Sequence, residues 1–354
     1  AVSDALAALV AGNGIVIKPD SQTPFTAIRA FELLEQAGLP EGLVQIVTGP
    51  GRSVGQAIIA SADYLMFTGS TATGRTIGGQ VGERLVGYSA ELGGKNAMVV
   101  TADADLERAV EGATVACFAN TGQLCISIER IYVPRGIASR FTKAFAARVD
   151  ALRLGAEQEY GPEVGALASP DQLAKVREHI DDAIAKGATV AAGGRPRPEI
   201  GPLFHEPTVL ADVTADMAVY REETFGPLVS IYAYDTVDEA VDAVNDTEYG
   251  LNASVYCSDV KHGRAIAARL MAGTVNVNDG YSSGWGSLDA PMGGMKASGV
   301  GRRHGRDGLL KYTESQTIAV RSALAAKLQD PGDDAPAYAR RFTKLLKAAK
   351  HLPR

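Results

Sequence analysis

Short apolar runs alternate with segments of helical periodicity along the first part of the chain. The apolar runs cover residues 14–18, 43–47 and 64–67, and a further strand is expected near 85–89. The helical periodicity covers residues 26–36 and 53–60. Apolar runs of this length are typical of strands buried in a parallel sheet. The βαβα order therefore predicts an α/β fold, with a mostly parallel sheet and helices on both faces.

The same alternation continues through the second half. Further helices are expected at residues 103–117, 138–152, 170–187 and 237–245, and strands at 97–100, 189–194, 207–210, 228–234 and 313–320. The glycine-rich run at 280–305 predicts a loop wrapped over other parts of the protein. The first residues also have helical periodicity, with Ser3 or Asp4 as N-cap and Gly12 as the end. No initiator methionine precedes them, so we expect a piece of a longer protein.

Composition excludes several classes of protein. The 354 residues are 46% hydrophobic with a net charge of −6 and no basic stripe, which argues against nucleic acid as a partner. Three scattered cysteines and five histidines without ligand spacing predict neither a disulfide framework nor a metal site. No apolar run approaches the roughly 18 residues of a membrane span. These features favour a soluble cytoplasmic protein without stable membrane insertion.

The last residues, 322–354, form a basic tail that leaves two interpretations open. An amphipathic helix there could bind an anionic surface, or it could be a solvated helix that packs on the same protein or on a sister subunit. Such helices are common in soluble proteins, so we favour the second interpretation. The basic residues of the tail are Lys327, Arg340, Arg341, Lys344, Lys347, Lys350 and Arg354.

A candidate phosphate site lies at residues 64–76, YLMFTGSTATGRT. A buried strand leads through Gly69 and Ser70 into a helix, whose first N–H groups and positive end suit a phosphate. The spacing from Gly69 to Thr76 nearly matches a P-loop, which leaves a P-loop NTPase as an alternative. Arginine stands where the P-loop lysine belongs, and no strand-terminal aspartate for Mg²⁺ is evident. An ordinary strand-to-helix turn is equally compatible.

Two further residues are candidates for covalent chemistry. Glu91 ends an apolar strand beside two glycines, where a carboxylate of raised pKa can act as a base, although a partnered structural charge is the alternative. Cys125 follows the helix-breaking sequence NTGQ, so its thiol is expected to face a cleft and act as a nucleophile if a cation or helix start favours the thiolate. Cys117 and Cys257 lie within predicted elements and are expected to be packing residues.

Together, these segments resemble the aldehyde dehydrogenase superfamily from about residue 1 to residue 320. The matching motifs are KPDSQTP, FTGSTATG, ELGGKN, NTGQLC, EETFGP and PMGGMKASGVGR. Within the superfamily, GQLCISIERIYV and GLLKYTESQTIA are similar to the actinobacterial NADP-dependent succinate-semialdehyde dehydrogenases. The resemblance implies NAD(P)-dependent oxidation of an aldehyde to an acid, with succinate semialdehyde as the expected substrate and no metal.

The resemblance also implies roles for individual residues. Cys125 matches the nucleophile and Glu91 the general base, while Gln123 and Ser287 match residues on the substrate side. Matches to the cofactor site are Lys18, Ser21, Gly51, Gly69, Ser70, Leu92, Glu223 and Phe225. The thiolate would add to the aldehyde, hydride would pass to the nicotinamide, and water activated by Glu91 would hydrolyse the thioester. The family's oxyanion-binding asparagine would precede residue 1, so we expect the chain alone to be inactive.

The same resemblance divides the chain. It implies a partial Rossmann-type nucleotide-binding domain (1–93), a catalytic domain (94–293), a return segment with an oligomerisation strand (294–320) and a tail (321–354). A homodimer or homotetramer is expected.

Cofactor and substrate preferences follow from single positions. Ser21 replaces the glutamate with which many relatives repel the 2′-phosphate, so NADP is expected, with NAD possible. Ala119 and Ser3 replace two arginines that would hold a substrate carboxylate, which leaves a broader or more apolar aldehyde preference open. A non-catalytic structural homologue, with Cys125 no more reactive than the other cysteines, is a further alternative.

Overall fold

The computed structural model describes residues 2–157, 160–321 and 334–351. The chain forms two compact units, Ala1–Thr313 and Glu314–Arg354, which are described separately. The first unit carries every candidate residue for catalysis and cofactor binding.

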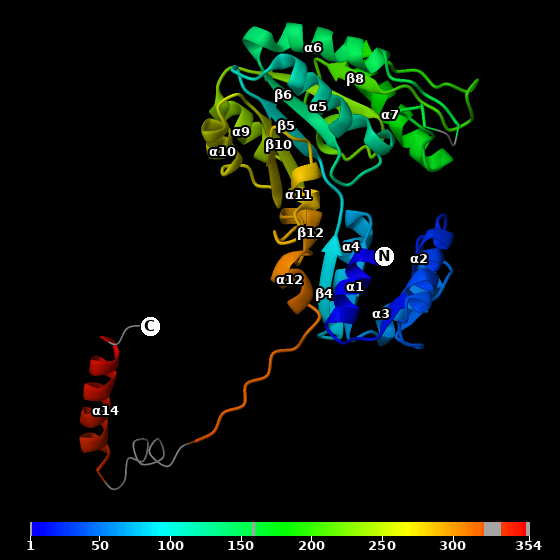
Figure 1. Cartoon of the computed structure of the whole chain (residues 1–354). Coiled ribbons are helices and arrows are strands. Elements are labelled where there is room, and N and C mark those ends of the chain that lie inside the picture. Colours follow the sequence, from blue (N-terminus) through cyan, green and yellow to red (C-terminus); the bar gives the residue numbers. More distant parts are fainter. Residues whose placement is uncertain (1, 158–159, 322–333, 352–354) are drawn as a thin grey trace. The chain divides into compact units, whose positions relative to one another are not determined.

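A seven-stranded sheet is the centre of the first unit (Figure 1). Its strands lie in the order β11-β10-β5-β6-β9-β8-β7, and only β7 runs antiparallel to its neighbour. The bounds are β5 Asn96–Val100, β6 Ile128–Pro134, β7 Thr189–Ala192, β8 Thr208–Ala211, β9 Leu228–Tyr234, β10 Asn252–Tyr256 and β11 Thr274–Val277. The predicted α/β fold with a mostly parallel sheet is confirmed.

Helices cover both faces of this sheet, because alternate strand residues point to opposite sides. Met98 and Val100 of β5 join the core beneath α5 (Leu106–Phe118) and α6 (Arg135–Asp150). Ala97 and Val99 join the core beneath α9 (Val237–Asn245) and α10 (Val260–Ala267). A third core lies under α7 (Pro170–Ala185) and α8 (Ala218–Arg221).

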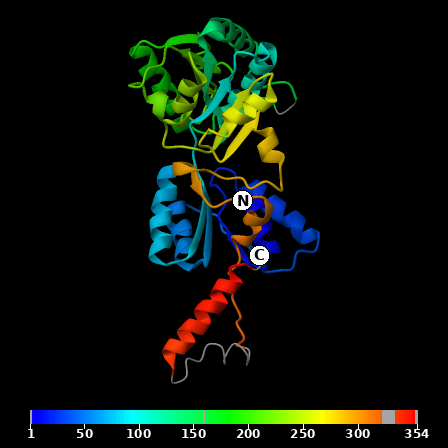
Figure 2. The ribbon, with the colours of Figure 1, turned by 90° about the vertical axis from the view of Figure 1, so that its left-hand side faces the viewer.

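The remaining strands form two small sheets. β1 and β2 pair in parallel, and β4 pairs with β3 in parallel and with β12 in antiparallel register. Helix α4 lies along the β3–β4 pair (Figure 2). These strands are β1 Ile15–Ile17, β2 Val44–Ile46, β3 Tyr64–Thr68, β4 Gly87–Glu91 and β12 Gly299–Val300. The helices of this part are α1 Val2–Val10, α2 Pro24–Gln36, α3 Gln56–Ser61, α4 Thr71–Glu83 and α12 Gly305–Leu310. Helix α11, Ser282–Gly286, lies beside β11 of the large sheet.

Two local predictions were wrong. Helix α1 already includes Val2, so Ser3 and Asp4 lie within it and do not cap it. The helix expected at 53–60 is divided into a π-helix, Gly51–Gly55, and α3. Residues 313–320, all of which the structure describes, form no strand within the single chain, so the strand expected between subunits stays a prediction. A strand needs a hydrogen-bonding neighbour, and the single chain offers none to this segment.

The second unit contains the helix α14, Ala335–Ala349. It is N-capped by Asp334, whose side chain accepts a hydrogen bond from the Ala337 N–H. Tyr338 and Phe342 stack on one side with ring centroids 5.6 Å apart. The helix has no buried residue, and its basic positions are exposed. Among the described residues, no helix is both long and apolar enough to cross a membrane.

Candidate active site

Glu91 is the last residue of β4 and is held there from both sides. Its backbone pairs with Thr68 of β3 and with Gly299 of β12, and its carbonyl oxygen accepts the Gly69 N–H at 3.1 Å. The residue is only 4% exposed. Burial is the main reason why the pKa of Glu91 rises to about 7, with Arg303 opposing it. A carboxylate of this pKa can exchange a proton near neutral pH.

The residues after Glu91 connect it to the candidate nucleophile. A Cβ atom on Gly93 would lie 2.5 Å from a carboxylate oxygen of Glu223, and one on Gly94 would lie 2.9 Å from the Cys125 carbonyl oxygen. Only glycines fit between these groups. Asn96 then donates its side-chain amide to the Cys125 carbonyl at 2.8 Å. The sequence ELGGKN therefore places the candidate base, the cysteine segment and Glu223 around one short loop.

Cys125 lies in a turn that precedes β6 and follows a strained backbone. Asn120 and Thr121 have φ values of 52° and 59°, and Gly122 has 70°. A Cβ atom at Gly122 would approach the Gly226 carbonyl oxygen to 2.2 Å, so glycine is required there. Three successive residues with positive φ are uncommon and mark a turn that its surroundings hold in place.

The Cys125 thiol and the Glu91 carboxylate act on each other electrostatically. Burial first, and then the charge of Glu91, raises the pKa of the Cys125 thiol to about 11. The segment after Pro291 approaches both groups, since Met292 packs in the apolar cluster around Cys125 and a Cβ on Gly293 would lie 3.1 Å from Glu91 Oε1. The predicted loop at 280–305 thus lies over the candidate site.

The structure does not favour the Cys125 thiolate, although a nearby cation was expected to do so. Arg303 lowers the pKa of Cys125, but burial and the acidic neighbours outweigh it. Cys117 and Cys257 are 2% and 4% exposed, and burial raises the pKa of both thiols. Their predicted role as packing residues is consistent with this burial.

A cluster of charges behind Glu91 was missed by the sequence reasoning. Arg303 Nη2 donates to Asp4 Oδ2 at 2.9 Å, and Arg303 Nε lies 3.7 Å from Glu91 Oε1. Lys311 Nζ is 3.8 Å from Asp4 Oδ1. Among the described atoms, Arg303 Nε has no hydrogen-bond partner, so the guanidinium can turn toward Glu91. Asp4 and Arg303 are 299 positions apart, and no local pattern connects them.

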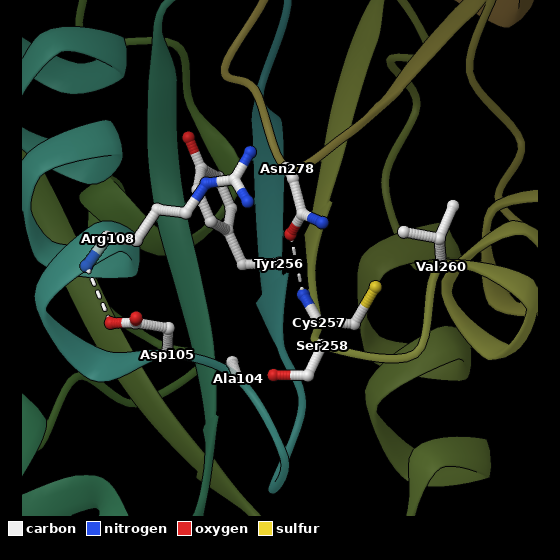
Figure 3. A pocket seen from close by; sticks show the side chains of 8 residues that line it. All are labelled: Ala104, Asp105, Arg108, Tyr256, Cys257, Ser258, Val260 and Asn278. Atoms are coloured by element: carbon white, nitrogen blue, oxygen red, sulfur yellow. Dashed lines mark hydrogen bonds between the residues drawn. The ribbon is translucent and has the colours of Figure 1, made fainter.

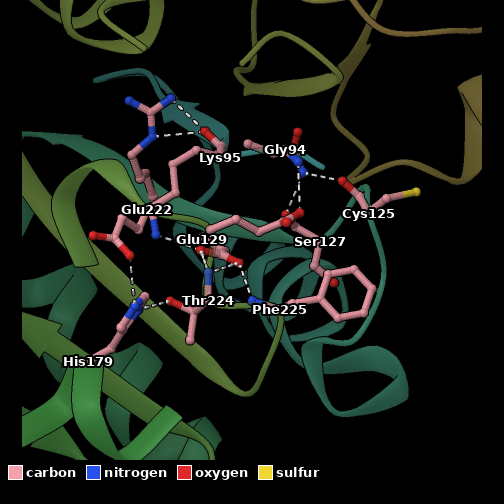
Figure 4. A network of polar contacts seen from close by, with 12 residues as sticks. Gly94, Lys95, Cys125, Ser127, Glu129, His179, Glu222, Thr224 and Phe225 are labelled. Atoms are coloured by element: carbon pink, nitrogen blue, oxygen red, sulfur yellow. Dashed lines mark hydrogen bonds and ion pairs between the residues drawn. The ribbon is translucent and has the colours of Figure 1, made fainter. Parts of the chain in front are cut away.

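Glu223 is held against the loop after Glu91. Its Oε1 accepts the Gly94 N–H at 2.8 Å, and burial together with the charge of Glu129 raises the pKa of Glu223 to about 7. The next two residues, Thr224 and Phe225, donate their N–H groups to Glu129 (Figure 4). Glu129 was not a candidate in the sequence, where it is one charge within a strand.

The candidate cofactor residues of the first part follow the carboxyl ends of parallel strands. Lys18 and Ser21 follow β1, Gly51 follows β2, and Gly69 and Ser70 lie between β3 and α4. In open α/β sheets this is the edge where nucleotides bind. The Ser70 side chain caps α4 by accepting the Thr73 N–H, so the helix start offers its remaining N–H groups outward.

This donor set fits a phosphorylated dinucleotide. The set combines an ammonium, hydroxyls and a helix start with open space at Gly51, where a Cβ would meet nothing within 4 Å. Lys18 is half-buried, and its ammonium donates to the Pro19 carbonyl at 2.6 Å. Ser21 is exposed and donates weakly to the Gly49 carbonyl at 3.4 Å. The contact with Pro19 leaves further N–H donors of the Lys18 ammonium for a phosphate.

Other candidates have mainly structural contacts. Leu92 packs against α4, where a Cβ on Gly74 would lie 2.5 Å from its Cδ2. The Gln123 side chain accepts the Ala168 N–H at 2.8 Å, so it ties a loop to the cysteine turn and is not free for a substrate. Ser287 is half-buried just after α11. Ala119 lies at the end of α5, while the side chain of Ser3 lies outside the described residues.

Two cavities lie away from these residues. One, of about 270 Å³, is lined by Arg108, Tyr256, Cys257 and Asn278 among others (Figure 3). The second, of about 320 Å³, adjoins it beside Tyr256 and Asp279. Neither is lined by Cys125 or Glu91. Within the described part of the chain, no group of histidine, cysteine and acidic residues could hold a metal ion.

Comparison with known sequences gives one family. A sequence profile of the Aldehyde dehydrogenase family matches residues 1–318. A protein of Mycolicibacterium smegmatis, provisionally named succinate-semialdehyde dehydrogenase (NADP+), is 56% identical over 353 residues, which are 99% of this chain and 68% of that protein. A succinate semialdehyde dehydrogenase of Acinetobacter baylyi is 40% identical over 310 residues, or 87% of this chain and 63% of its own.

Solved structures agree with the sequences. The crystal structure of an aldehyde dehydrogenase from Brucella melitensis matches with a TM-score of 0.83 and 40% identity, over 88% of this chain and 63% of the other. The NAD+ complex of an aldehyde dehydrogenase from Bacillus cereus also gives 0.83 and 40%, over 87% and 62%. The chain thus spans about two thirds or less of the proteins that it matches.

Proposed function

Because the chain belongs to the aldehyde dehydrogenase family, we propose that Cys125 and Glu91 are the nucleophile and general base of an aldehyde oxidation. The substrate would be an aldehyde, the product its carboxylic acid, and the hydride acceptor NADP. The Met292–Gly293 segment, which lies beside both Cys125 and Glu91, carries this proposal, together with the effect of the Glu91 charge on the thiol. Because the chain spans only part of its relatives, the proposal concerns a protein extended to their full length.

The residues of this chain account for the proton and bond changes. Glu91 is partly ionised near pH 7 and can take a proton from the thiol or from water. The sulfur adds to the carbonyl carbon, and the new alkoxide is stabilised by the backbone N–H of Cys125. A dinucleotide held by Lys18, Ser70 and Glu223 would supply the acceptor for the hydride that leaves that carbon. Water that has lost its proton to Glu91 then displaces the sulfur from the thioester and releases the acid.

The decisive test compares matched variants in the full-length protein. Cys125→Ser should abolish NADP-linked oxidation, and Glu91→Gln should reduce kcat by about two to four orders of magnitude because the proton acceptor is lost. Cys117→Ser is the control and should retain the parent activity, since this thiol is buried in a different core. Substantial oxidation by Cys125→Ser would overturn the proposal. In the parent, iodoacetamide should label Cys125 faster than Cys117 or Cys257; equal labelling would favour a non-catalytic homologue.

NADP is the proposed cofactor for an electrostatic reason. Ser21 itself carries no carboxylate, so the repulsion that a glutamate at this position would exert on a 2′-phosphate is absent. The neighbouring Asp20 carboxylate accepts the Gln22 N–H. Both curated names cited above concern succinate semialdehyde, and one includes NADP. The variant Ser21→Glu should raise KM for NADP at least about tenfold more than KM for NAD. Equal changes in the two KM values would contradict the assignment. Ser21→Thr, which adds no charge, is the control.

Succinate semialdehyde is the proposed substrate on the strength of these relatives. Ala119 supplies no cation, and Ser287 is the remaining candidate to hold a carboxylate. Full-length protein should therefore give a higher kcat/KM for succinate semialdehyde than for butanal, which has the same chain length without the carboxylate. A higher value for butanal would favour the broader aldehyde preference.

The P-loop alternative is weakened by one contact. Arg75, which would have to replace the phosphate lysine, donates to Glu248 at 2.8 Å. Mg²⁺-dependent nucleotide binding that survives Cys125→Ala would support the P-loop NTPase instead. The division at residue 93, a homodimer or homotetramer, and a cytoplasmic location remain part of the proposal.

A further inference from the structure

A buried ion pair lies beside the proposed site without taking part in its chemistry. Lys95 Nζ and Glu129 Oε2 are 2.5 Å apart, and their side chains are 1% and 4% exposed. The two residues belong to different segments, since Lys95 precedes β5 and Glu129 lies in β6. A pair this deeply buried costs desolvation energy that its attraction only partly returns, so stability alone is a weak explanation for it.

The second function of the Glu129 carboxylate is to bind backbone. Its Oε1 accepts the N–H groups of Thr224 at 3.0 Å and Phe225 at 2.9 Å, and Oε2 accepts the Thr224 N–H at 2.9 Å. Figure 4 shows Glu129 between Lys95 and this turn. Hydrogen bonds to an ionised acceptor are about twice as strong as neutral ones. Lys95 Nζ donates to the same carboxylate at Oε2.

The turn would not adopt this shape by local preference. Phe225 has a φ of 56°, a region that costs energy for a residue with a bulky side chain. From the other side, Gln172 donates to the carbonyl oxygens of Thr224 and Phe225 at 2.8 and 2.9 Å. His179 Nδ1 contacts Thr224 Oγ1 at 3.0 Å. Glu129, Gln172 and His179 thus hold the backbone that carries Glu223 and Phe225.

We propose that Glu129, held in place by its contact with Lys95, is a positioning residue that holds the 223–225 turn in the form that contacts the nicotinamide end of the dinucleotide. This inference rests on the proposed function and on the family resemblance, in which Glu223 and Phe225 match the residues that hold the nicotinamide ribose and ring. Glu129 acts through the turn and touches no reacting atom. What it contributes is the acceptor oxygen, while Lys95 keeps that oxygen compatible with burial.

Two double variants distinguish the role of Glu129 as a hydrogen-bond acceptor from the role of its charge. Lys95→Met/Glu129→Gln removes both charges but retains a side-chain oxygen for the two N–H groups. Lys95→Met/Glu129→Leu removes the charges and the oxygen while filling similar volume, a replacement that buried ion pairs often tolerate. In the full-length protein, the Leu variant should show a KM for NADP at least about tenfold higher than the Gln variant, because two buried hydrogen bonds are lost.

Two readouts do not depend on oxidation. Hydrogen exchange in the absence of NADP should be faster for the Thr224 and Phe225 amides in the Leu variant than in the Gln variant, while β5 and β6 keep their protection. Hydrolysis of p-nitrophenyl acetate needs the thiol but no hydride acceptor, so it should differ less than about twofold between the two variants. Asp235→Asn is the control and should change neither value, since it breaks only an exposed ion pair between the residue after β9 and Arg135 at the start of α6.

The outcomes separate this inference from the function on which it rests. Equal KM values and equal amide exchange in the Leu and Gln variants would overturn the positioning role, even if Cys125→Ser still abolished oxidation. Oxidation that survives Cys125→Ser would instead overturn the proposed function, whatever the amides of the turn do. If the Leu variant loses protection throughout β5 and β6, Glu129→Asp provides the comparison, since it keeps the charge but shortens the reach to both amides.

Discussion

At the scale of single residues, the burial of Glu91 raises its pKa toward neutrality and lowers the free energy of unfolding at neutral pH. Its pKa of about 7 in the folded protein exceeds the value of about 4.5 expected for an unfolded chain. The unfolded chain therefore releases this proton first, and the free energy of unfolding falls as the pH rises from about 4.5 to about 7. Each pKa unit corresponds to about 1.4 kcal/mol. A buried base is thus a cost that the fold carries for chemistry.

We predict that Glu91→Gln stabilises the protein in a pH-dependent way. The difference in unfolding free energy between the variant and the parent should grow by roughly 2–3 kcal/mol in favour of the variant between pH 5 and pH 8. Urea unfolding at both pH values measures it. Glu35→Gln, at an exposed position of α2, is the control and should show little change with pH. A difference for Glu91→Gln that stays constant with pH would show that Glu91 is not buried as described.

Residues within motifs could be predicted from the sequence, and residues that act on them could not. Glu91 and Cys125 stand next to glycines and turn signals, which mark a special backbone. Arg303 and Glu129 carry no such mark, because their partners lie 299 and about 95 positions away in the chain. A lone charge in a sequence is usually a solvated one, and only the fold shows that these two are buried.

At the scale of secondary structure, periodicity predicted the elements that bury a face on their own chain. The strands β5 and β9 and the helix α9 have the expected positions, because the core that selects their pattern belongs to the same chain. The strand expected at 313–320 does not form within the single chain. Its pattern of apolar residues indicates a strand that pairs with another subunit. In the single chain, its apolar residues Ile318 and Val320 are 82% and 89% exposed.

We predict that this segment pairs between subunits in the full-length protein. In an extended segment Ile318 and Val320 point to one side, so Ile318→Asp/Val320→Asp should shift an oligomer toward monomers. Size-exclusion chromatography with light scattering measures the mass. Thr317→Asp, which adds a charge on the other side, should have a smaller effect. An unchanged mass for the double variant would exclude this segment from the interface.

At the scale of the whole molecule, the chain contains the proposed nucleophile and the proposed base but spans only about two thirds of the length of its relatives. Within it, burial and the charge of Glu91 hold the Cys125 thiol in its protonated form at neutral pH. The alkoxide formed in the proposed reaction would have the Cys125 backbone N–H as a donor, and a single donor is worth about 10²–10³ in rate in sites of this kind. A second donor of this strength would change the rate by a similar factor.

We predict that the 354-residue chain alone oxidises succinate semialdehyde with NADP at less than about 1% of the kcat of a version extended to full length, because we expect the extended version to supply a second oxyanion donor. Stopped-flow absorbance at the wavelength of reduced nicotinamide measures both. Labelling of Cys125 by iodoacetamide is the companion measurement, and in the short chain its rate should rise about tenfold per pH unit between pH 7 and pH 10, as for a thiol of pKa about 11. Comparable turnover in the two versions would mean that the short chain contains its own second donor, and the proposed oxyanion contacts would have to be reassigned. A labelling rate that levels off near pH 8 would instead show that the Cys125 thiolate is already favoured without the additional residues.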